Sequence, residues 1–189
     1  MHYKVVLDDV TEEQNNYQEP QFELSKLITT ENRELNSIKI RYNIKTDVME
    51  CKIGSQHSII KSPEKLKEIN INGECFEYKK YLVKKDTTCG YLQKLYSGGQ
   101  KIYAKYFIPS TKGKVDFQQP KSYYLVQTKT ELPAKVSSAN SLISKYYKSF
   151  LKEAKEFEKS NQLNTNIPQD FKRLLTYLDN LSKDIVASR

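Results

Sequence analysis

The chain has 189 residues, of which 38% are hydrophobic, 29% are charged and 11% are aromatic. This composition excludes an intrinsically disordered chain, because 14 Tyr and 7 Phe supply large side chains that a core can bury. The net charge of +8 is uneven, since residues 1–34 hold eight acids and three bases whereas residues 78–148 hold fourteen lysines and three acids. Such a field can steer an anionic partner, or it can be compensated within the chain by the acidic arm folding over the basic surface.

The first 20 residues are polar and acidic and end in Pro20, which predicts a loosely held N-terminal arm at 1–20. The apolar run in this arm, residues 5–7, is too short for a signal peptide. No part of the chain approaches the ~20 apolar residues that are needed to cross a bilayer. We therefore expect a chain without a transmembrane segment, which either stays in the cytoplasm or is numbered from after a removed leader.

Residues 21–134 are predicted to form an antiparallel β-meander of consecutive hairpins. A short strand is expected at 21–28, and residues 37–44 then alternate between apolar and polar side chains, which is the period of a strand with one buried face. A turn at 45–47 leads into a second alternating run at 48–53. These two runs predict the first hairpin.

Two further hairpins and a last strand follow. Asn72-Gly73 stands in the middle of residues 69–78, and this dipeptide favours a type I′ hairpin turn because both of its residues accept a positive φ. Ser97-Gly98-Gly99-Gln100 separates another pair of apolar runs, and residues 121–128 predict one more strand. The three turns therefore belong to one meander.

Residues 135–189 are predicted to form a helical hairpin, because the apolar period changes there from two residues to 3.6. One apolar stripe spans 142–157, with Ser137 or Ser138 as its N-cap, and a second spans 171–185. Two amphipathic helices with a short link pack antiparallel, on each other and on the sheet. The whole chain is thus predicted to be a single α+β domain.

A series of motifs covers residues 36–180. It starts with the strand Ile40-Arg41-Tyr42-Asn43-Ile44, which is followed by Thr46-Asp47 and Glu50. It continues with a strand at 75–78, a hairpin that begins at Gly90-Tyr91, the tyrosine-rich strand Tyr123-Tyr124-Leu125 and the helix pair.

This series resembles an uncharacterised family of cell-envelope proteins of the Bacteroidota, in which a strand with the letters RYN opens a β-meander that ends in a helix pair. The family is mostly seen with an export signal and has no established activity. The resemblance therefore implies a periplasmic or outer-membrane-associated protein, and it carries over no functional residues. The chain departs from the family because its start shows no leader or lipoprotein cysteine.

The sequence contains no catalytic constellation, so we expect no enzymatic activity, no metal and no cofactor. The segment from Ser97 to Lys101 lies between predicted strands, whereas a phosphate-binding loop has to open a helix. Cys51, Cys75 and Cys89 lack the paired spacing of zinc ligands. Buried thiols in strands are the simpler interpretation, and one disulfide with a free thiol stays open if the protein is exported.

A mixture of lysines and tyrosines is the feature that bears on function. If Ile102, Ala104 and Tyr106 face the core, the residues between them face the solvent. Such a surface can hold anions and stack bases, although exposed lysines can equally serve only to prevent aggregation between sheet edges. The candidate contact residues are Tyr81, Lys84, Lys85, Lys94, Lys101, Tyr103 and Lys105.

With the resemblance, these observations predict a non-enzymatic cell-envelope protein that acts through surface contacts with a protein or a polyanion. The expected partner is an unidentified envelope protein or an acidic polymer, and the expected location is the periplasm or the outer membrane, with the cytoplasm as the alternative. Two other functions stay open. One is a basic nucleic-acid-binding protein, and the other is a small-ligand binder or enzyme with a pocket between sheet and helices.

Overall fold

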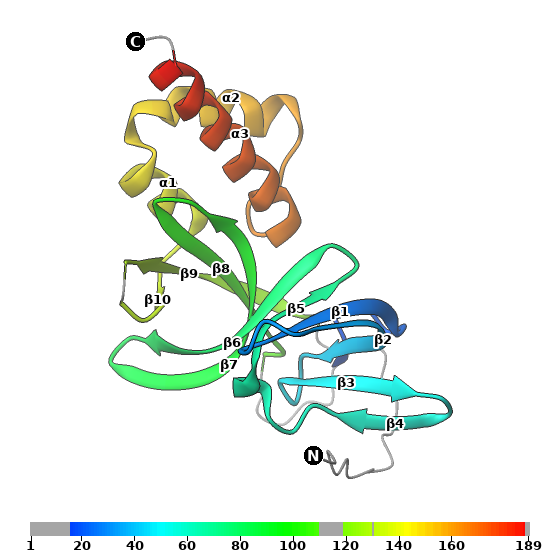
Figure 1. Cartoon of the computed structure of the whole chain (residues 1–189). Helices are drawn as coiled ribbons and strands as arrows, with labels where there is room; N and C mark the ends of the chain where they lie inside the picture. Colours follow the sequence, from blue (N-terminus) through cyan, green and yellow to red (C-terminus); the bar gives the residue numbers. More distant parts are fainter. Residues whose placement is uncertain (1–15, 110–118, 130, 188–189) are drawn as a thin grey trace. The chain divides into compact units, whose positions relative to one another are not determined.

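The computed structural model describes residues 16–109, 119–129 and 131–187. In these ranges the chain forms a hairpin-connected sheet followed by three α-helices, which confirms the predicted α+β class (Figure 1). The predicted acidic arm at 1–20 lies largely outside the described residues, which begin within it at Asn16.

The described strands are β1 (Glu23–Thr29), β2 (Glu34–Asn43), β3 (Val48–Ile53), β4 (Gln56–Ile59), β5 (Leu66–Ile71), β6 (Glu74–Val83), β7 (Asp86–Ser97), β8 (Gln100–Phe107), β9 (Lys121–Thr128) and β10 (Ala134–Lys135). They follow the hydrogen-bonded order β10-β9-β8-β7-β6-β5-β1-β2-β3-β4. Two runs of consecutive hairpins, β1 to β4 and β5 to β10, are joined where β1 pairs with β5. The predicted hairpin meander is therefore correct, with one parallel pair added between β10 and β6.

The predicted hairpin turns lie where the sequence places them. Asn72 and Gly73 join β5 to β6 and have φ of 48° and 80°, as a type I′ turn requires. The segment from Ser97 to Lys101 contains the turn between β7 and β8, at Gly98 and Gly99, and opens no helix. The β3–β4 and β6–β7 hairpins are absent from the sequence prediction, which has no strand at β4. The β6–β7 turn includes Lys84, whose φ is 60°.

Contacts between residues divide the chain into two compact units. Unit 1 comprises Met1–Lys80, Cys89–Gln93 and Tyr106–Lys121, and unit 2 comprises Tyr81–Thr88, Lys94–Lys105 and Ser122–Arg189. Strands β6, β7 and β8 contribute residues to both units. All seven candidate contact residues belong to unit 2.

The core of unit 1 is built around Tyr42, which is 2% exposed. Its ring centre lies 5.6 Å from that of Phe76, 5.9 Å from that of Tyr91 and 6.5 Å from that of Tyr106, in tilted or edge-on orientations. Aromatic pairs in these orientations contribute stability beyond the area that they bury. The alternation around Tyr42 therefore predicts this buried face of β2 correctly, but the opposite face is buried as well at Arg41 and Asn43, where the sequence predicts exposure.

In unit 2 the first predicted helix is wrong in one respect, because it is interrupted at Tyr147. Helix α1 (Ala139–Tyr146) ends there, the 3₁₀ turn η3 (Lys148–Phe150) follows, and α2 (Leu151–Ser160) begins after it. Tyr147 has φ −128° and ψ 35°, outside the helical region, and this places its side chain in the interior. The predicted cap is correct, because the Ser138 side chain accepts a backbone hydrogen bond from the first turn of α1.

Helix α3 (Pro168–Ala187) packs against α2 and against the sheet of unit 2, as predicted for the helical hairpin. The ring of Tyr177 on α3 stacks on that of Phe157 on α2, with centres 4.0 Å apart and planes at 7°. The ring of Phe171 lies 4.5 Å from that of Tyr124 on β9. Both side chains of this last pair are buried, so the space between α3 and β9 is filled.

Candidate functional site

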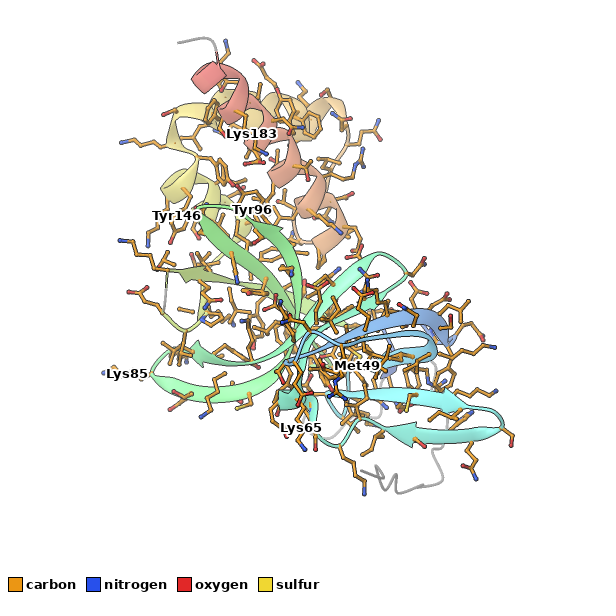
Figure 2. All side chains as sticks on the ribbon, viewed as in Figure 1. Met49, Lys65, Lys85, Tyr96, Tyr146 and Lys183 are labelled. Carbon is orange, nitrogen blue, oxygen red and sulfur yellow. The ribbon has the colours of Figure 1, made fainter. Side chains whose placement is uncertain are left out.

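Four of the seven candidate contact residues reach the solvent. Lys84 and Lys85 are exposed at the turn between β6 and β7, where Figure 2 labels Lys85. Lys94 on β7 and Lys101 on β8 are half-buried. The turn between β6 and β7 therefore presents two adjacent cations that the sequence analysis assigned to a strand surface.

The other three candidate contact residues are buried, which corrects the expectation that they face outward. Tyr81 is 4% exposed, Tyr103 is 0% exposed and Lys105 is 6% exposed. Alternation predicts exposure only for a sheet with one covered face. In unit 2, β10 pairs with β9 and also with the end of β6, so the sheet folds back on itself. The face of β8 that carries Tyr103 turns inward. The Tyr103 hydroxyl donates to Gln127 Oε1 at 3.2 Å.

Unit 2 carries the whole net charge of the chain, with 16 Lys and Arg against 8 Asp and Glu, whereas unit 1 has 15 of each. In α2 and α3, six cations are balanced by six acids, and the part of unit 2 before α2 holds nine lysines against Asp86 and Glu131. Six of these lysines are exposed, and no described residue forms an ion pair with any of them. These exposed lysines of unit 2 are Lys84, Lys85, Lys129, Lys135, Lys145 and Lys148.

The sequence analysis missed a buried ion pair in unit 1. Arg41 on β2 lies opposite Glu50 on β3, and both side chains are 4% exposed. Arg41 Nε donates to Glu50 Oε2 at 2.8 Å, Nη1 donates to the carbonyl of Pro20 at 3.0 Å, and Nη2 donates to the hydroxyl of Tyr17 at 3.1 Å. The buried charge is thus paired and hydrogen-bonded, which offsets its loss of hydration.

Residues 16–22 cover this ion pair. Tyr17 pairs with Asn43 of β2, and Glu23 pairs with Ile40. Six residue steps therefore separate the two pairings on this segment, whereas only three separate them on β2. The extra residues loop over the guanidinium group of Arg41, whose central carbon lies 3.9 Å from the ring centre of Tyr17 and 4.3 Å from that of Phe22. Cation–π contacts in such a desolvated position are worth about 2 kcal/mol. The segment is therefore held by the charge that it covers.

The turn after β2 belongs to the same network. Asn43 Nδ2 donates to Glu50 Oε1 at 2.9 Å, and Asn43 Oδ1 accepts from the backbone N–H of Thr46 at 3.2 Å. The Tyr42 hydroxyl donates to Asp47 Oδ1 at 2.6 Å, and Asp47 itself has a positive φ of 56°. The RYN motif and the residues that follow it therefore have structural partners throughout, which explains their spacing without any catalytic role.

A polar cluster in unit 2 joins the β7–β8 hairpin to α3. The Tyr96 hydroxyl donates to Asp179 Oδ1 at 2.7 Å, and Lys183 Nζ lies 2.6 Å from Asp179 Oδ2. The hydrogen bonds from Lys183 and Tyr96 hold the pKa of Asp179 below its usual value of 3.8. Burial, followed by the hydrogen bond to Asp179, raises the pKa of Tyr96. The carboxylate thus stays ionised at neutral pH and fixes the hairpin to the helix.

Glu68, Cys75 and Glu77 form a cluster on β5 and β6 in which the ligand atoms lie within 4.8 Å of one another. Carboxylates and a thiolate at this spacing are groups that bind divalent metals. However, Glu77 already forms an ion pair with Lys79 at 2.9 Å, which compensates one of the two negative charges. The sequence analysis missed the cluster because the three residues meet only through the pairing of the two strands.

All three cysteines are free thiols. Cys51 is buried, as expected for a small apolar residue in a strand, and burial raises the pKa of its thiol. Cys75 is half-buried and Cys89 is exposed, so the expectation of buried thiols is correct for only one of the three.

Comparison of the chain with protein-family models, with curated proteins and with solved structures finds no match. The resemblance to the Bacteroidota family therefore stays a hypothesis that depends on the strand and helix motifs. In the described part of the chain, no helix combines the length and the apolar character that a bilayer crossing requires.

Proposed function

We propose that this chain is a non-enzymatic cell-envelope protein that acts by binding an acidic partner through the exposed lysines of unit 2. The observation that carries the proposal is the charge of unit 2 before α2, where the sequence has nine lysines and two acids and six of the lysines are exposed without an ion-pair partner among the described residues. Uncompensated surface cations attract anions and raise the rate of encounter with them. The even balance of α2 and α3 means that this attraction is directed to one part of the unit.

The proposed location in the envelope depends on the resemblance described above. Fractionation of the source cells, followed by detection of the protein with an antibody, tests it independently of binding. The protein is expected in the periplasmic or membrane fraction. Recovery in the cytosol alone would contradict the location and leave the binding proposal to be tested by itself.

A nucleic-acid-binding protein is the main alternative, and the burial of two tyrosines counts against it. Proteins that bind single strands combine a basic groove with exposed aromatic rings on which bases stack. Tyr81 and Tyr103, which the sequence offers for this purpose, are 4% and 0% exposed. These two rings are therefore not available for base stacking.

A small-ligand binder or enzyme with a pocket between sheet and helices is the second alternative. The contact between Phe171 and Tyr124 counts against it, because these two buried rings pack directly on each other between α3 and β9. The Tyr124 hydroxyl already donates to the carbonyl of Thr165 at 2.7 Å. A pocket requires open volume with converging polar groups.

Titration of the purified protein with anionic polymers tests the proposal. Polygalacturonate, single-stranded DNA and neutral dextran are compared by isothermal calorimetry at about 50 and about 200 mM salt. Binding to an anionic polymer that weakens steeply with salt, without binding to dextran, is expected because several lysines release counterions together. Absence of binding to every anionic polymer at the lower salt concentration would refute the proposed function.

A further inference from the structure

Three of the six exposed lysines of unit 2, Lys84, Lys85 and Lys135, come from elements that the fold brings together. β10 pairs with β6 through Ala134 and Leu82, and the backbone N–H of Leu82 donates to the carbonyl of Pro133 at 2.7 Å. Lys84 and Lys85 follow Leu82 by two and three residues, and Lys135 follows Ala134 directly. At about 3.3 Å per residue along a strand, these three cations lie within reach of one polymer chain. Figure 1 shows β10 beside β9 and leading into α1.

Two of the six exposed lysines of unit 2, Lys135 and Lys145, lie over the rings of tyrosines. Lys135 Nζ is 4.2 Å from the ring centre of Tyr123, which is half-buried on β9. Lys145 Nζ is 5.1 Å from the ring centre of Tyr146, which is half-buried on α1 and labelled in Figure 2. In each pair an ammonium group lies over a tyrosine ring. The pair therefore offers a positive charge together with an aromatic ring that has apolar faces and a polar hydroxyl group. A uronic acid matches both halves, since its ring has an apolar C–H face and carries a carboxylate at its edge.

The choice of lysine over arginine points to the same kind of partner. The part of unit 2 before α2 contains nine lysines and no arginine. Arginine is the residue that recognises phosphates and carboxylates in a fixed bidentate geometry, whereas lysine acts as a hydrated point charge on a flexible stem. A set of lysines therefore suits a long, flexible anion whose charges are spaced along a chain.

We infer that the acidic partner of unit 2 is a carboxylated polysaccharide, which the Lys84–Lys85 turn and Lys135 hold by charge while the ring of Tyr123 contacts its sugars. This inference rests on the proposed function and names the partner class. An anionic lipid surface fits less well, because a protein that lies in the membrane interface buries a broad apolar face there. Among the described residues of the loop before β10, Leu132 is the large apolar side chain that is exposed.

The experiment compares four forms of the full-length protein in their affinity for polygalacturonate at low salt. Lys84→Glu with Lys85→Glu, and Lys135→Glu alone, are expected to weaken binding about tenfold or more, because each replaces an attraction with a repulsion. The matched control is Lys155→Glu with Lys159→Glu on α2, which makes the same charge change where cations and acids balance. This control is expected to weaken binding by no more than about twofold. Circular dichroism of each variant verifies its fold.

Tyr123→Leu tests the aromatic contribution. It keeps an apolar side chain on β9 but removes the ring, so affinity for polygalacturonate is expected to fall about three- to tenfold while the dependence on salt stays unchanged. An unchanged affinity would overturn the sugar contact of this tyrosine.

Two competitors separate the polysaccharide from other polyanions. Single-stranded DNA and vesicles that contain anionic phospholipid are each titrated under the same conditions. Binding to either that is as tight as binding to polygalacturonate would overturn the inferred partner class while supporting the proposed function. If the control substitutions weaken binding to polygalacturonate as much as the lysine substitutions do, the assigned surface is wrong. Absence of binding to all three would refute the proposed function as well.

Discussion

Unit 1 and unit 2 carry positive charge in opposite ways. In unit 1, Arg41 is buried between two aromatic rings, and its charge is matched by Glu50, a carbonyl and a hydroxyl. In unit 2, six exposed lysines have no ion-pair partner among the described residues. The buried cation is costly unless every donor is satisfied, whereas the exposed cations are stabilised by water and cost little.

This difference separates charge that specifies a fold from charge that is available to a partner. A buried ion pair loses much stability when one member is removed, because the other is left without compensation. Surface charges contribute little to stability and therefore change freely with the needs of binding. The two units should accordingly respond to charge substitutions with effects of very different size.

The largest loss of stability is expected for Glu50→Gln. The variant keeps the shape of the side chain but leaves Arg41 buried without a counter-ion, which should cost about 3–5 kcal/mol. Urea unfolding followed by circular dichroism measures this loss. The double variant Arg41→Met with Glu50→Met serves as the control and should recover part of the stability, because it leaves no buried charge. A loss below about 1 kcal/mol in the single variant would contradict the contrast between the units.

The second effect concerns the contact between the β7–β8 hairpin and α3 in unit 2. A Cβ atom on Gly98 would overlap the ring and hydroxyl of Tyr96, whereas a Cβ on Gly99 would meet nothing within 4 Å. Gly98→Ala should therefore displace Tyr96 from Asp179 and cost about 1–3 kcal/mol. Gly99→Ala should stay within about 0.5 kcal/mol of the parent protein. Equal melting temperatures for the two variants would refute this placement of Tyr96.

Tyr96→Phe isolates the hydrogen bond to Asp179 and should cost about 1 kcal/mol at neutral pH. The pKa of Asp179 is lower in the folded than in the unfolded chain, so its stabilisation is present above the unfolded value of 3.8 and is lost as the pH falls through the folded pKa. The variant lacks the Tyr96 hydroxyl, whose hydrogen bond is one cause of the lowered pKa of Asp179. The stability difference between parent and variant should therefore shrink below pH 3.8, and a difference that stays constant there would argue against the linkage.

The smallest effect on stability is expected at the exposed lysines. Lys84→Glu with Lys85→Glu breaks no ion pair and should change the free energy of unfolding by less than about 0.5 kcal/mol. Lys84→Gly should instead stabilise the turn by up to about 1 kcal/mol, because φ at this position is 60° and glycine adopts it without steric cost. A large destabilisation by either substitution would mean that these charges serve the fold.

The arrangement of the first hairpin and its ion pair could be anticipated in part. Alternation around Tyr42 and a turn at 45–47 predict this hairpin but not its register, because a turn of three residues would place residue 41 opposite residue 51. In the structure the turn spans residues 44–47, and Arg41 lies opposite Glu50. The pattern also cannot supply the cover over this face, since residues 16–20 belong to the predicted polar arm and residues 21 and 22 to a predicted strand.

The sequence by itself determined which segments become strands and which become helices, because burial of one face imposes a period of two or of 3.6 on neighbouring residues. It also determined the turn at Asn72-Gly73, since few residues accept a positive φ. Only the tertiary structure decided that Tyr103 and Lys105 are buried, because the pairing of β10 with β6 covers a face that local alternation assigns to solvent. Pairing between distant segments leaves no periodic trace in the chain, so the alternation within β8 could not show that Lys105 is buried.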